Sequence, residues 1–462
     1  MNEPATIDLA ASIEGQRLSW FLIQLVLVSW IVTFFDGFDM NVIAFVAPYL
    51  SSEFHLDKSM LGNIFSIGLV GTMIGGFAFG WLGDRIGRRP TMILSTALFG
   101  GLTLAFALAA SYGQLLLLRL LDGIAIGGML PLCWALNIEY APTRFRATIV
   151  TVIMVGYSMG SSLGGPIAVW LIPRFGWSSV YIFGGAASLL AALLLLAVLP
   201  ESLRFMVGRN EAPARIARAL RRMLPGCAVP AGARFIDSVE TERRAGARNF
   251  RIGLLFKDAL RWVTPLFWLA YIASSMTAFF LATWTPLVFE ALGFSRTDAA
   301  WAVSINSAGG ALGGLLLMRF TDNRGPISIT AMPLMAVPLL LLAGLADLAH
   351  PVFLVLNFFI VLFLIGGHFG LHSTAGLFYP SAYRGNGAGW ATSVAKIGSI
   401  AGPFVGGLVL SSHLPTRAVF AVLAICPAVF ALSIFAVGRI WAHVWHRQTI
   451  EAAIVTAQPE AA

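Results

Sequence analysis

Residues 80–89 read GWLGDRIGRR, a short charged segment between two long apolar ones. Glycines permit a tight turn and close helix contact, Asp84 can accept hydrogen bonds from backbone amides at a helix N-terminus, and the arginines can pair with neighbouring helices. The flanking segments, at about 60–82 and 91–111, have the length of about 20 residues that a helix needs to cross a bilayer. The stretch therefore predicts two membrane-spanning helices joined by a tight loop.

The composition of the whole chain agrees with a membrane protein. Of its 462 residues, 58% are hydrophobic and only 11% are charged, whereas soluble domains carry about 25% charged residues. A soluble enzyme is therefore not expected, and no soluble catalytic constellation is found in the sequence. The net charge of +8 does not indicate nucleic-acid binding, because the basic residues lie between apolar segments. The three cysteines are isolated from one another, so neither a disulfide framework nor a zinc site is predicted.

Twelve apolar segments are long enough to predict twelve membrane-spanning helices. They lie at about 21–49, 60–82, 91–111, 114–139, 146–172, 177–199, 264–289, 299–320, 327–347, 351–378, 386–412 and 417–445. The first is too long for the core of a cleavable signal peptide, which has about 7–15 residues. In the polar segment 200–262, residues 211–224 (EAPARIARALRRML) predict an amphipathic helix. It is either a solvated linker helix or a helix whose basic face meets anionic lipids.

The placement of basic residues predicts the orientation in the membrane. Short cytoplasmic loops are enriched in Lys and Arg, and placing both termini in the cytoplasm puts most of the 30 basic residues on that side. Arg119 and Lys396 are the two that fall within spans. We therefore expect a multi-pass protein of the cell inner (cytoplasmic) membrane with both termini inside.

The two halves of the chain are related by an internal repeat. Shifting the sequence by 238 positions places Gly75 on Gly313, Gly76 on Gly314, Asp84 on Asp322, Gly87 on Gly325, Arg146 on Arg384, Gly160 on Gly398 and Gly164 on Gly402. This constant offset predicts an all-α membrane protein with two pseudo-symmetric six-helix bundles, 1–199 and 263–462, and the linker 200–262 between them. Such duplication suits alternating access, in which two bundles rock around a site at mid-membrane depth.

Buried charges that break this repeat are the candidate functional residues. Asp36 and Asp39, in the first span, correspond to Ser274 and Thr277. A carboxylate in hydrocarbon costs about 2.5–3.5 kcal/mol, and two of them three positions apart lie about 60° apart around a helix, so both can face one aqueous cavity. Their repulsion and desolvation predict proton binding near neutral pH. The alternative is that they only pair with Arg119 and hold the bundle together.

Two basic residues in the spans are candidates for binding an anion. Lys396 lies about 15 Å inside the eleventh span, and a buried cation needs an anion. We predict that Lys396 binds a substrate carboxylate, with a structural ion pair as the alternative. Arg119, which corresponds to Asn357, begins RLLDGIAIGG (119–128) in the fourth span. Asp122, three residues later, is either a local partner that neutralises Arg119 or a functional residue.

Histidines and aromatic residues complete the candidate set. His368 and His372 are one helical turn apart in the tenth span, the spacing of a metal pair, but no third ligand is evident. Contact with substrate or simple packing is therefore favoured over metal binding, and no cofactor is predicted. Tyr157 and Trp390 are candidates for contact with an aromatic ring. Further aromatic candidates are Phe38, Trp134, Trp284 and Phe369.

The charged loop resembles a signature of the major facilitator superfamily. GWLGDRIGRR matches its GxxxDRxGRR pattern at every specified position, and RLLDGIAIGG matches its RxxxGxxxG pattern. The resemblance covers the whole chain and implies that Asp84, Arg85 and Arg88 form a cytoplasmic latch that stabilises the outward-open state. The second copy keeps Asp322, but asparagine at 323 replaces the arginine of the pattern, which puts a matching latch in doubt.

A narrower resemblance concerns function. DGFD (36–39), together with LPES (199–202) at the end of the sixth span, resembles the aromatic acid:proton symporter family. That resemblance implies import of an aromatic carboxylate with protons, and a basic residue both at Lys396 and twelve positions earlier, at Arg384. We expect a monomer whose partners are an aromatic acid anion, protons and the lipid bilayer. The alternatives are a symporter for an aliphatic carboxylate, such as a dicarboxylate or a shikimate-like acid, an efflux pump, and an aromatic acid receptor.

Overall fold

The computed structural model describes residues 6–16, 19–226, 229–230, 233–238, 251–324, 329–379, 384–412, 414–415 and 418–456. The described chain is mostly helical, and its contacts divide it into two compact units, Met1–Arg248 and Asn249–Ala462. The division falls inside the predicted linker 200–262, whose role between the bundles stays a prediction.

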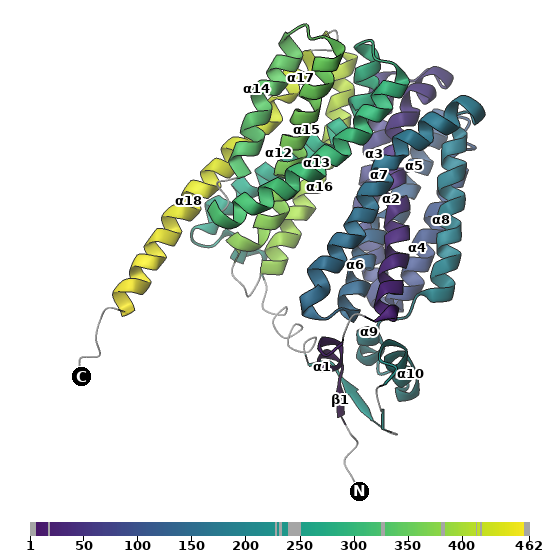
Figure 1. Cartoon of the computed structure of the whole chain (residues 1–462), viewed down its shortest axis with the longest axis vertical. Coiled ribbons are helices and arrows are strands. Elements are labelled where there is room, and N and C mark those ends of the chain that lie inside the picture. Colours follow the sequence, from purple (N-terminus) through teal and green to yellow (C-terminus); the bar gives the residue numbers. More distant parts are fainter. Residues whose placement is uncertain are drawn as a thin grey trace. The chain divides into compact units, whose positions relative to one another are not determined.

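The first unit holds the membrane-length helices of the N-terminal half and a small structure beneath them (Figure 1). Its elements are β1 (Thr6–Asp8), α1 (Leu9–Glu14), α2 (Trp20–Glu53), α3 (Lys58–Ile86), α4 (Arg88–Phe106), α5 (Tyr112–Gly127), α6 (Met129–Tyr140), α7 (Thr143–Phe175), α8 (Ser178–Val198), α9 (Leu203–Gly208), α10 (Pro213–Met223) and β2 (Arg234–Ile236).

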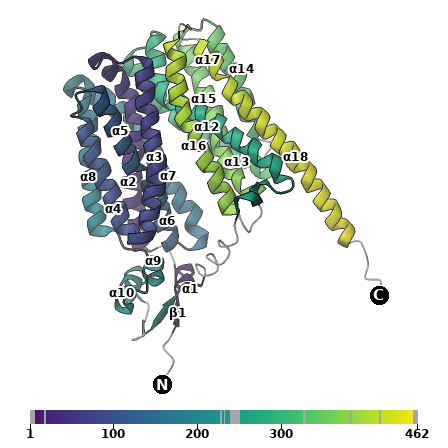
Figure 2. The same ribbon diagram turned by 180° about the vertical axis from the view of Figure 1, so that it is seen from behind.

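The second unit repeats the arrangement of long helices, and its last helix, α18, is drawn in yellow in Figure 2. Its elements are η1 (Ile252–Phe256), α12 (Leu260–Ala291), α13 (Arg296–Arg324), α14 (Ala331–Leu345), α15 (His350–Phe378), α16 (Arg384–Ser411), α17 (Ala418–Leu423) and α18 (Ile425–Thr456).

The helix contacts in both units follow the predicted repeat. In the first unit α2 packs on α7 and α3 on α5, and in the second α12 packs on α16 and α13 on α15. A Cβ at Gly160 would lie 1.8 Å from the Phe34 carbonyl oxygen, and one at Gly398 would lie 2.1 Å from that of Ile272. Both residues of the second pair stand 238 positions after those of the first. The predicted fold class, with two related bundles, is confirmed.

Each predicted span falls on one helix or on two consecutive helices, and these helices differ in length and in how apolar they are. Nine helical stretches within the described part of the chain are long and apolar enough to cross a membrane. The other predicted spans correspond to α4, α13 and α14. Helix α4 has 19 residues and begins with two arginines, and α14 has 15 residues. Helix α4 packs against α8, and α14 packs against α15.

Two predicted spans are interrupted rather than continuous. The fourth breaks at Gly128, where a Cβ would lie 2.2 Å from Cβ of Phe79 on α3, and Pro131 follows in the first turn of α6. The twelfth breaks at Ala424, with Pro427 in the first turn of α18. Proline lacks the N–H that would continue the hydrogen bonds of a preceding helix. Helix α18 also continues to Thr456, beyond the predicted end at 445.

A small substructure joins the N-terminus to the segment after the sixth span. Strand β1 pairs in parallel with β2, with Ile7 opposite Phe235, which sequence analysis did not predict. The predicted amphipathic helix is α10. Its apolar residues Ile216, Leu220 and Met223 are buried in the core of this unit, and its arginines are exposed. The apolar face of α10 is therefore covered by the protein.

Candidate functional site

A cluster of charged side chains inside the first unit joins Asp39 of α2 to Arg119 and Asp122 of α5. Nη1 of Arg119 donates to Oδ2 of Asp39 at 2.7 Å and to Oδ2 of Asp122 at 3.0 Å. The hydroxyl of Thr103, on α4, donates to Oδ1 of Asp122 at 3.2 Å. The three charged residues are at most 4% exposed. One guanidinium nitrogen thus joins carboxylates from two helices.

Glycines allow the helices around this cluster to approach closely. A Cβ at Gly68 on α3 would lie 2.9 Å from Nε of Arg119, so the missing side chain makes room for the arginine. Gly37 lies between the two aspartates of α2. A Cβ at this position would lie 2.1 Å from the Tyr157 carbonyl oxygen on α7, so only glycine allows this approach. Gly37 and Gly68 therefore set where Asp39 and Arg119 meet.

Asp36 has different neighbours from Asp39. It is 2% exposed and lies within electrostatic range of the Cys133 thiol on α6 and the Tyr157 hydroxyl on α7. Tyr157 is partly buried and hydrogen-bonds with the side chain of Asn41, which in turn donates to the Gly37 carbonyl oxygen at 2.9 Å. The structure places Asp39 in an ion pair with Arg119.

The second unit carries the other candidates. Lys396 lies near the middle of α16 and is partly buried. His368 on α15 shares a hydrogen bond of 2.9 Å between its Nδ1 and Oγ of Ser274, the position that corresponds to Asp36. Trp390 is 41% exposed and stacks on Trp268 with ring centroids 6.2 Å apart. Asn357, the counterpart of Arg119, is buried, and its amide has no hydrogen-bond partner among the described residues.

Some predicted residues fall where side chains are not described. These are His372, Asp322 and Arg384. Among the residues that the structure does describe, no group of three or more His, Cys, Asp or Glu is placed to hold a metal ion.

The charged loop forms a connected network at the ends of α3 and α4. Arg88 pairs with Asp84 at 2.8 Å and with Glu139 on α6 at 3.4 Å. Arg85 instead lies over the ring of Trp81, with Cζ 4.1 Å from its centroid. The predicted latch residues Asp84 and Arg88 are therefore joined directly, whereas Arg85 is not part of that ion pair.

Glu201, from LPES, caps the N-terminus of α4. Its Oε1 accepts hydrogen bonds from the backbone amides of Arg88 at 2.9 Å and Arg89 at 3.2 Å. Gly87 has φ +108°, and a Cβ there would lie 2.2 Å from the Glu201 carboxylate. Burial raises the pKa of Glu201, although the amide hydrogen bonds oppose this shift. Sequence analysis noted LPES but gave Glu201 no role, and it missed Glu139.

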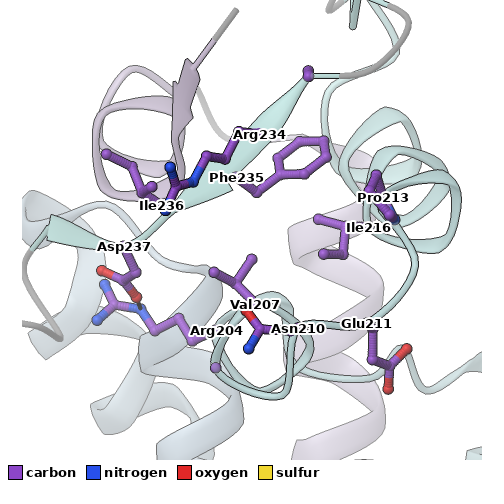
Figure 3. A pocket seen from close by; sticks show the side chains of 12 residues that line it. Arg204, Val207, Asn210, Glu211, Pro213, Ile216, Arg234, Phe235, Ile236 and Asp237 are labelled. Carbon is purple, nitrogen blue, oxygen red and sulfur yellow. Dashed lines mark ion pairs between the residues drawn. The ribbon is translucent and has the colours of Figure 1, made fainter. Parts of the chain in front are cut away.

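A cavity of about 420 Å³ lies in the small substructure, between α9, α10 and β2 (Figure 3). The Arg204–Asp237 ion pair, at 3.5 Å, stands on one side, and Val207, Ile216 and Phe235 line the same space. Sequence analysis predicted no site here, because these residues come together only through the tertiary contacts of α10 with α9 and β2.

Comparisons with known proteins agree with the fold and the motifs. The family model of the Major Facilitator Superfamily matches residues 29–381 and 267–444. A gallate transporter of Pseudomonas putida is 32% identical over 437 residues, which cover 94% of this chain and 96% of the relative. The 4-hydroxybenzoate transporter PcaK of Acinetobacter baylyi is 30% identical, with 93% of this chain and 94% of the relative covered.

A solved structure supports the same fold. The xylose transporter XylE from E. coli, in a partially occluded inward-open conformation, has a TM-score of 0.68 and is 18% identical, covering 89% of this chain and 98% of that chain. The relatives are transporters, in agreement with the prediction of a transporter rather than an enzyme. With matching helices, an internal repeat and relatives along nearly its whole length, the chain belongs to the Major Facilitator Superfamily of transporters.

Proposed function

We propose that this transporter imports an aromatic carboxylic acid together with protons. The observation that carries the proposal is the buried Asp39–Arg119 ion pair, found in a chain whose relatives are named gallate and 4-hydroxybenzoate transporters. A carboxylate inside the membrane is costly and marks an ion or proton pathway. Asp36, three positions earlier, is buried as well.

In this proposal, Asp36 and Asp39 bind the coupling protons. Arg119 favours the ionised form of Asp39, to which it donates a hydrogen bond, and so assists proton release. Binding a proton lowers the charge buried in the first unit, and alternating access by the two halves then carries the proton across the membrane.

The second unit supplies groups that suit an aromatic anion. Lys396 offers a partly buried cation for the substrate carboxylate. His368, hydrogen-bonded to Ser274, offers a donor or acceptor for a ring hydroxyl, and Trp390 offers an exposed ring for stacking. His372 belongs to the same proposed set, to which α7 of the first unit adds Tyr157.

The latch and the location complete the proposal. Asp84, Arg85 and Arg88, with Asp322 in the second half, stabilise one conformational state of a monomer in the inner membrane. The Asp84–Arg88 ion pair and the Arg88–Glu139 contact support such a role for the first loop. Both termini lie in the cytoplasm, which the distribution of basic residues supports.

Uptake into proteoliposomes tests this function. We would measure uptake of labelled benzoate, 4-hydroxybenzoate, protocatechuate, gallate, vanillate and succinate under an inward proton gradient. We expect gradient-dependent uptake of at least one aromatic acid. Uptake of succinate alone would replace the proposal with transport of an aliphatic carboxylate, and outward transport of the aromatic acids would indicate an efflux pump.

Matched variants test the proposed residues in the same assay. Asp36→Asn and Lys396→Ala are expected to abolish coupled uptake, because the first removes a proposed proton-binding group and the second removes the cation proposed to bind the substrate carboxylate. Asp57→Asn and Lys58→Ala remove the same charges from exposed positions at the start of α3 and are expected to leave uptake unchanged. Full uptake by Asp36→Asn or Lys396→Ala would remove that residue from the proposed site.

A further inference from the structure

We propose that Asp122 forms a second proton-binding unit with Asp39, in which the two carboxyl groups share one proton. This inference rests on the proposed proton coupling and adds to it. Asp122 lies within RLLDGIAIGG but occupies none of the specified positions of the RxxxGxxxG pattern.

Geometry brings the two carboxyl groups together around a single cation. Oδ2 of Asp39 and Oδ2 of Asp122 both accept from Nη1 of Arg119, at 2.7 Å and 3.0 Å. The two carboxyl groups also lie within hydrogen-bonding reach of each other. Ionised carboxylates are acceptors only, so a hydrogen bond between two of them requires a proton on one. Asp39 and Asp122 are therefore arranged to hold a proton between them.

The charge balance leads to the same conclusion. With both carboxyl groups ionised, Asp39, Asp122 and Arg119 carry a net charge of −1, and all three are at most 4% exposed. Water does not screen such a buried excess charge, so it is costly inside a membrane. One added proton makes the cluster neutral. Arg119 keeps one carboxylate ionised, and the second carboxyl group then carries the proton.

None of the surrounding groups named here adds a positive charge that would neutralise the cluster without a proton. Asp36, on α2, is a further acid, and Thr103, on α4, is an uncharged donor to Asp122. From α8, the phenol of Tyr181 lies within electrostatic range of Asp39, Arg119 and Asp122, and its hydroxyl has no hydrogen-bond partner among the residues described. On α3, Gly68 packs against Arg119 and contributes no side chain.

The arrangement has a consequence for the coupling ratio. The outside solution supplies one proton to Asp36 and another to the Asp39–Asp122 unit, and both are released on the inside. Two protons entering with one monovalent anion move one positive charge inward, so the membrane potential drives uptake. In Asp122→Asn, Asp39 and Arg119 form a simple ion pair that stays ionised, which leaves one proton and an electroneutral cycle.

The transport experiment separates these two cycles. Wild-type protein in proteoliposomes is given an inside-negative potassium diffusion potential without a pH gradient, with the aromatic acid found in the uptake panel as the probe. We expect wild-type uptake to rise with the potential, and Asp122→Asn uptake to respond only to a pH gradient. Potential-driven uptake by Asp122→Asn that equals that of the wild type would overturn the proposal.

A second measurement decides the question even if Asp122→Asn does not transport. Infrared difference spectra of the purified protein, between mildly acidic and alkaline pH, report the carbonyl stretch of protonated carboxyl groups. We expect a band that both Asp122→Asn and Asp39→Asn lose and that Asp57→Asn retains. An unchanged band in Asp122→Asn would refute the shared proton. Because no substrate is present, this result stands apart from any failure of the proposed uptake.

Discussion

Asp36 and Asp39 stand one helical turn apart on α2, yet their surroundings differ. Asp39 meets a cation from α5, whereas Asp36 lies within electrostatic range of the Cys133 thiol and the Tyr157 phenol. Two aspartates that are close in the sequence thus have different partners, because the partner of Asp39 comes from α5 and the neighbours of Asp36 come from α6 and α7.

At this scale, Gly68 should be sensitive to any side chain. A Cβ there would lie 2.9 Å from Nε and 3.1 Å from Cγ of Arg119, so the arginine must move away from Asp39. Hydrogen bonds to charged groups contribute about 1.5–3 kcal/mol. We therefore expect initial uptake rates to fall about tenfold or more in Gly68→Val, since 1.4 kcal/mol is about tenfold in rate. Gly101→Val, in open space on α4, is the control, and equal rates in both variants would contradict the expectation.

Glu201 should give a pH dependence of stability. Burial raises its pKa above the ordinary value of 4.5, so the folded state binds the proton more tightly than the unfolded state does. The free energy of unfolding then falls as pH rises from 4.5 through the pKa of the folded protein. We expect wild type to lose thermal stability relative to Glu201→Gln over this window. A difference between the two melting temperatures that stays constant with pH would show that burial of Glu201 has no such effect.

At the scale of elements, glycines define the contacts between helices in both halves. Gly75 and Gly313 lie against the carbonyl oxygens of Ile124 and Leu362, respectively, at the same offset that relates Gly160 to Gly398. Small residues are common where membrane helices approach closely, because packing drives their association. The repeat therefore preserves the closest backbone contacts even where the polar residues differ.

Equivalent substitutions in the two halves should accordingly have equivalent effects. Gly160→Ala and Gly398→Ala each place a Cβ about 2 Å from a backbone oxygen, so the helices must separate. Overpacking costs about 1–3 kcal/mol, and melting in detergent should reveal similar losses for both variants. Gly101→Ala and Gly389→Ala have no atoms within 4 Å of the new Cβ and serve as controls in the same halves. A loss confined to one half would mean that the contacts are not equivalent.

At the scale of the whole molecule, the charge distribution predicts one orientation. The basic loop residues keep their segments in the cytoplasm because translocating them is unfavourable. A green fluorescent protein fused to the C-terminus should therefore fluoresce, and alkaline phosphatase fused after Leu56 should be active. Active phosphatase at the C-terminus, or inactive phosphatase after Leu56, would reverse the proposed orientation.

The sequence by itself determined the helices, the repeat and the charged loop, because length, hydropathy and turn chemistry are properties of neighbouring residues. It also singled out Asp36, Asp39, Arg119 and Lys396, since a charge inside an apolar run is visible without a structure. Sequence analysis did not predict the breaks at Gly128 and Ala424, because these depend on close contact with another helix or on a proline near the start of the next one.

Only the tertiary structure decided which of these charges meet. Arg119 and Asp39 are 80 positions apart, and Glu201 caps a helix that begins 113 positions earlier. The pairing of β1 with β2 joins residues at opposite ends of the first unit. Such contacts depend on how closely helices approach, which glycines permit but do not specify. The ion pair between Asp39 and Arg119 arises in the same way, because the bundle holds α2 and α5 where the Arg119 side chain reaches from one helix to the other.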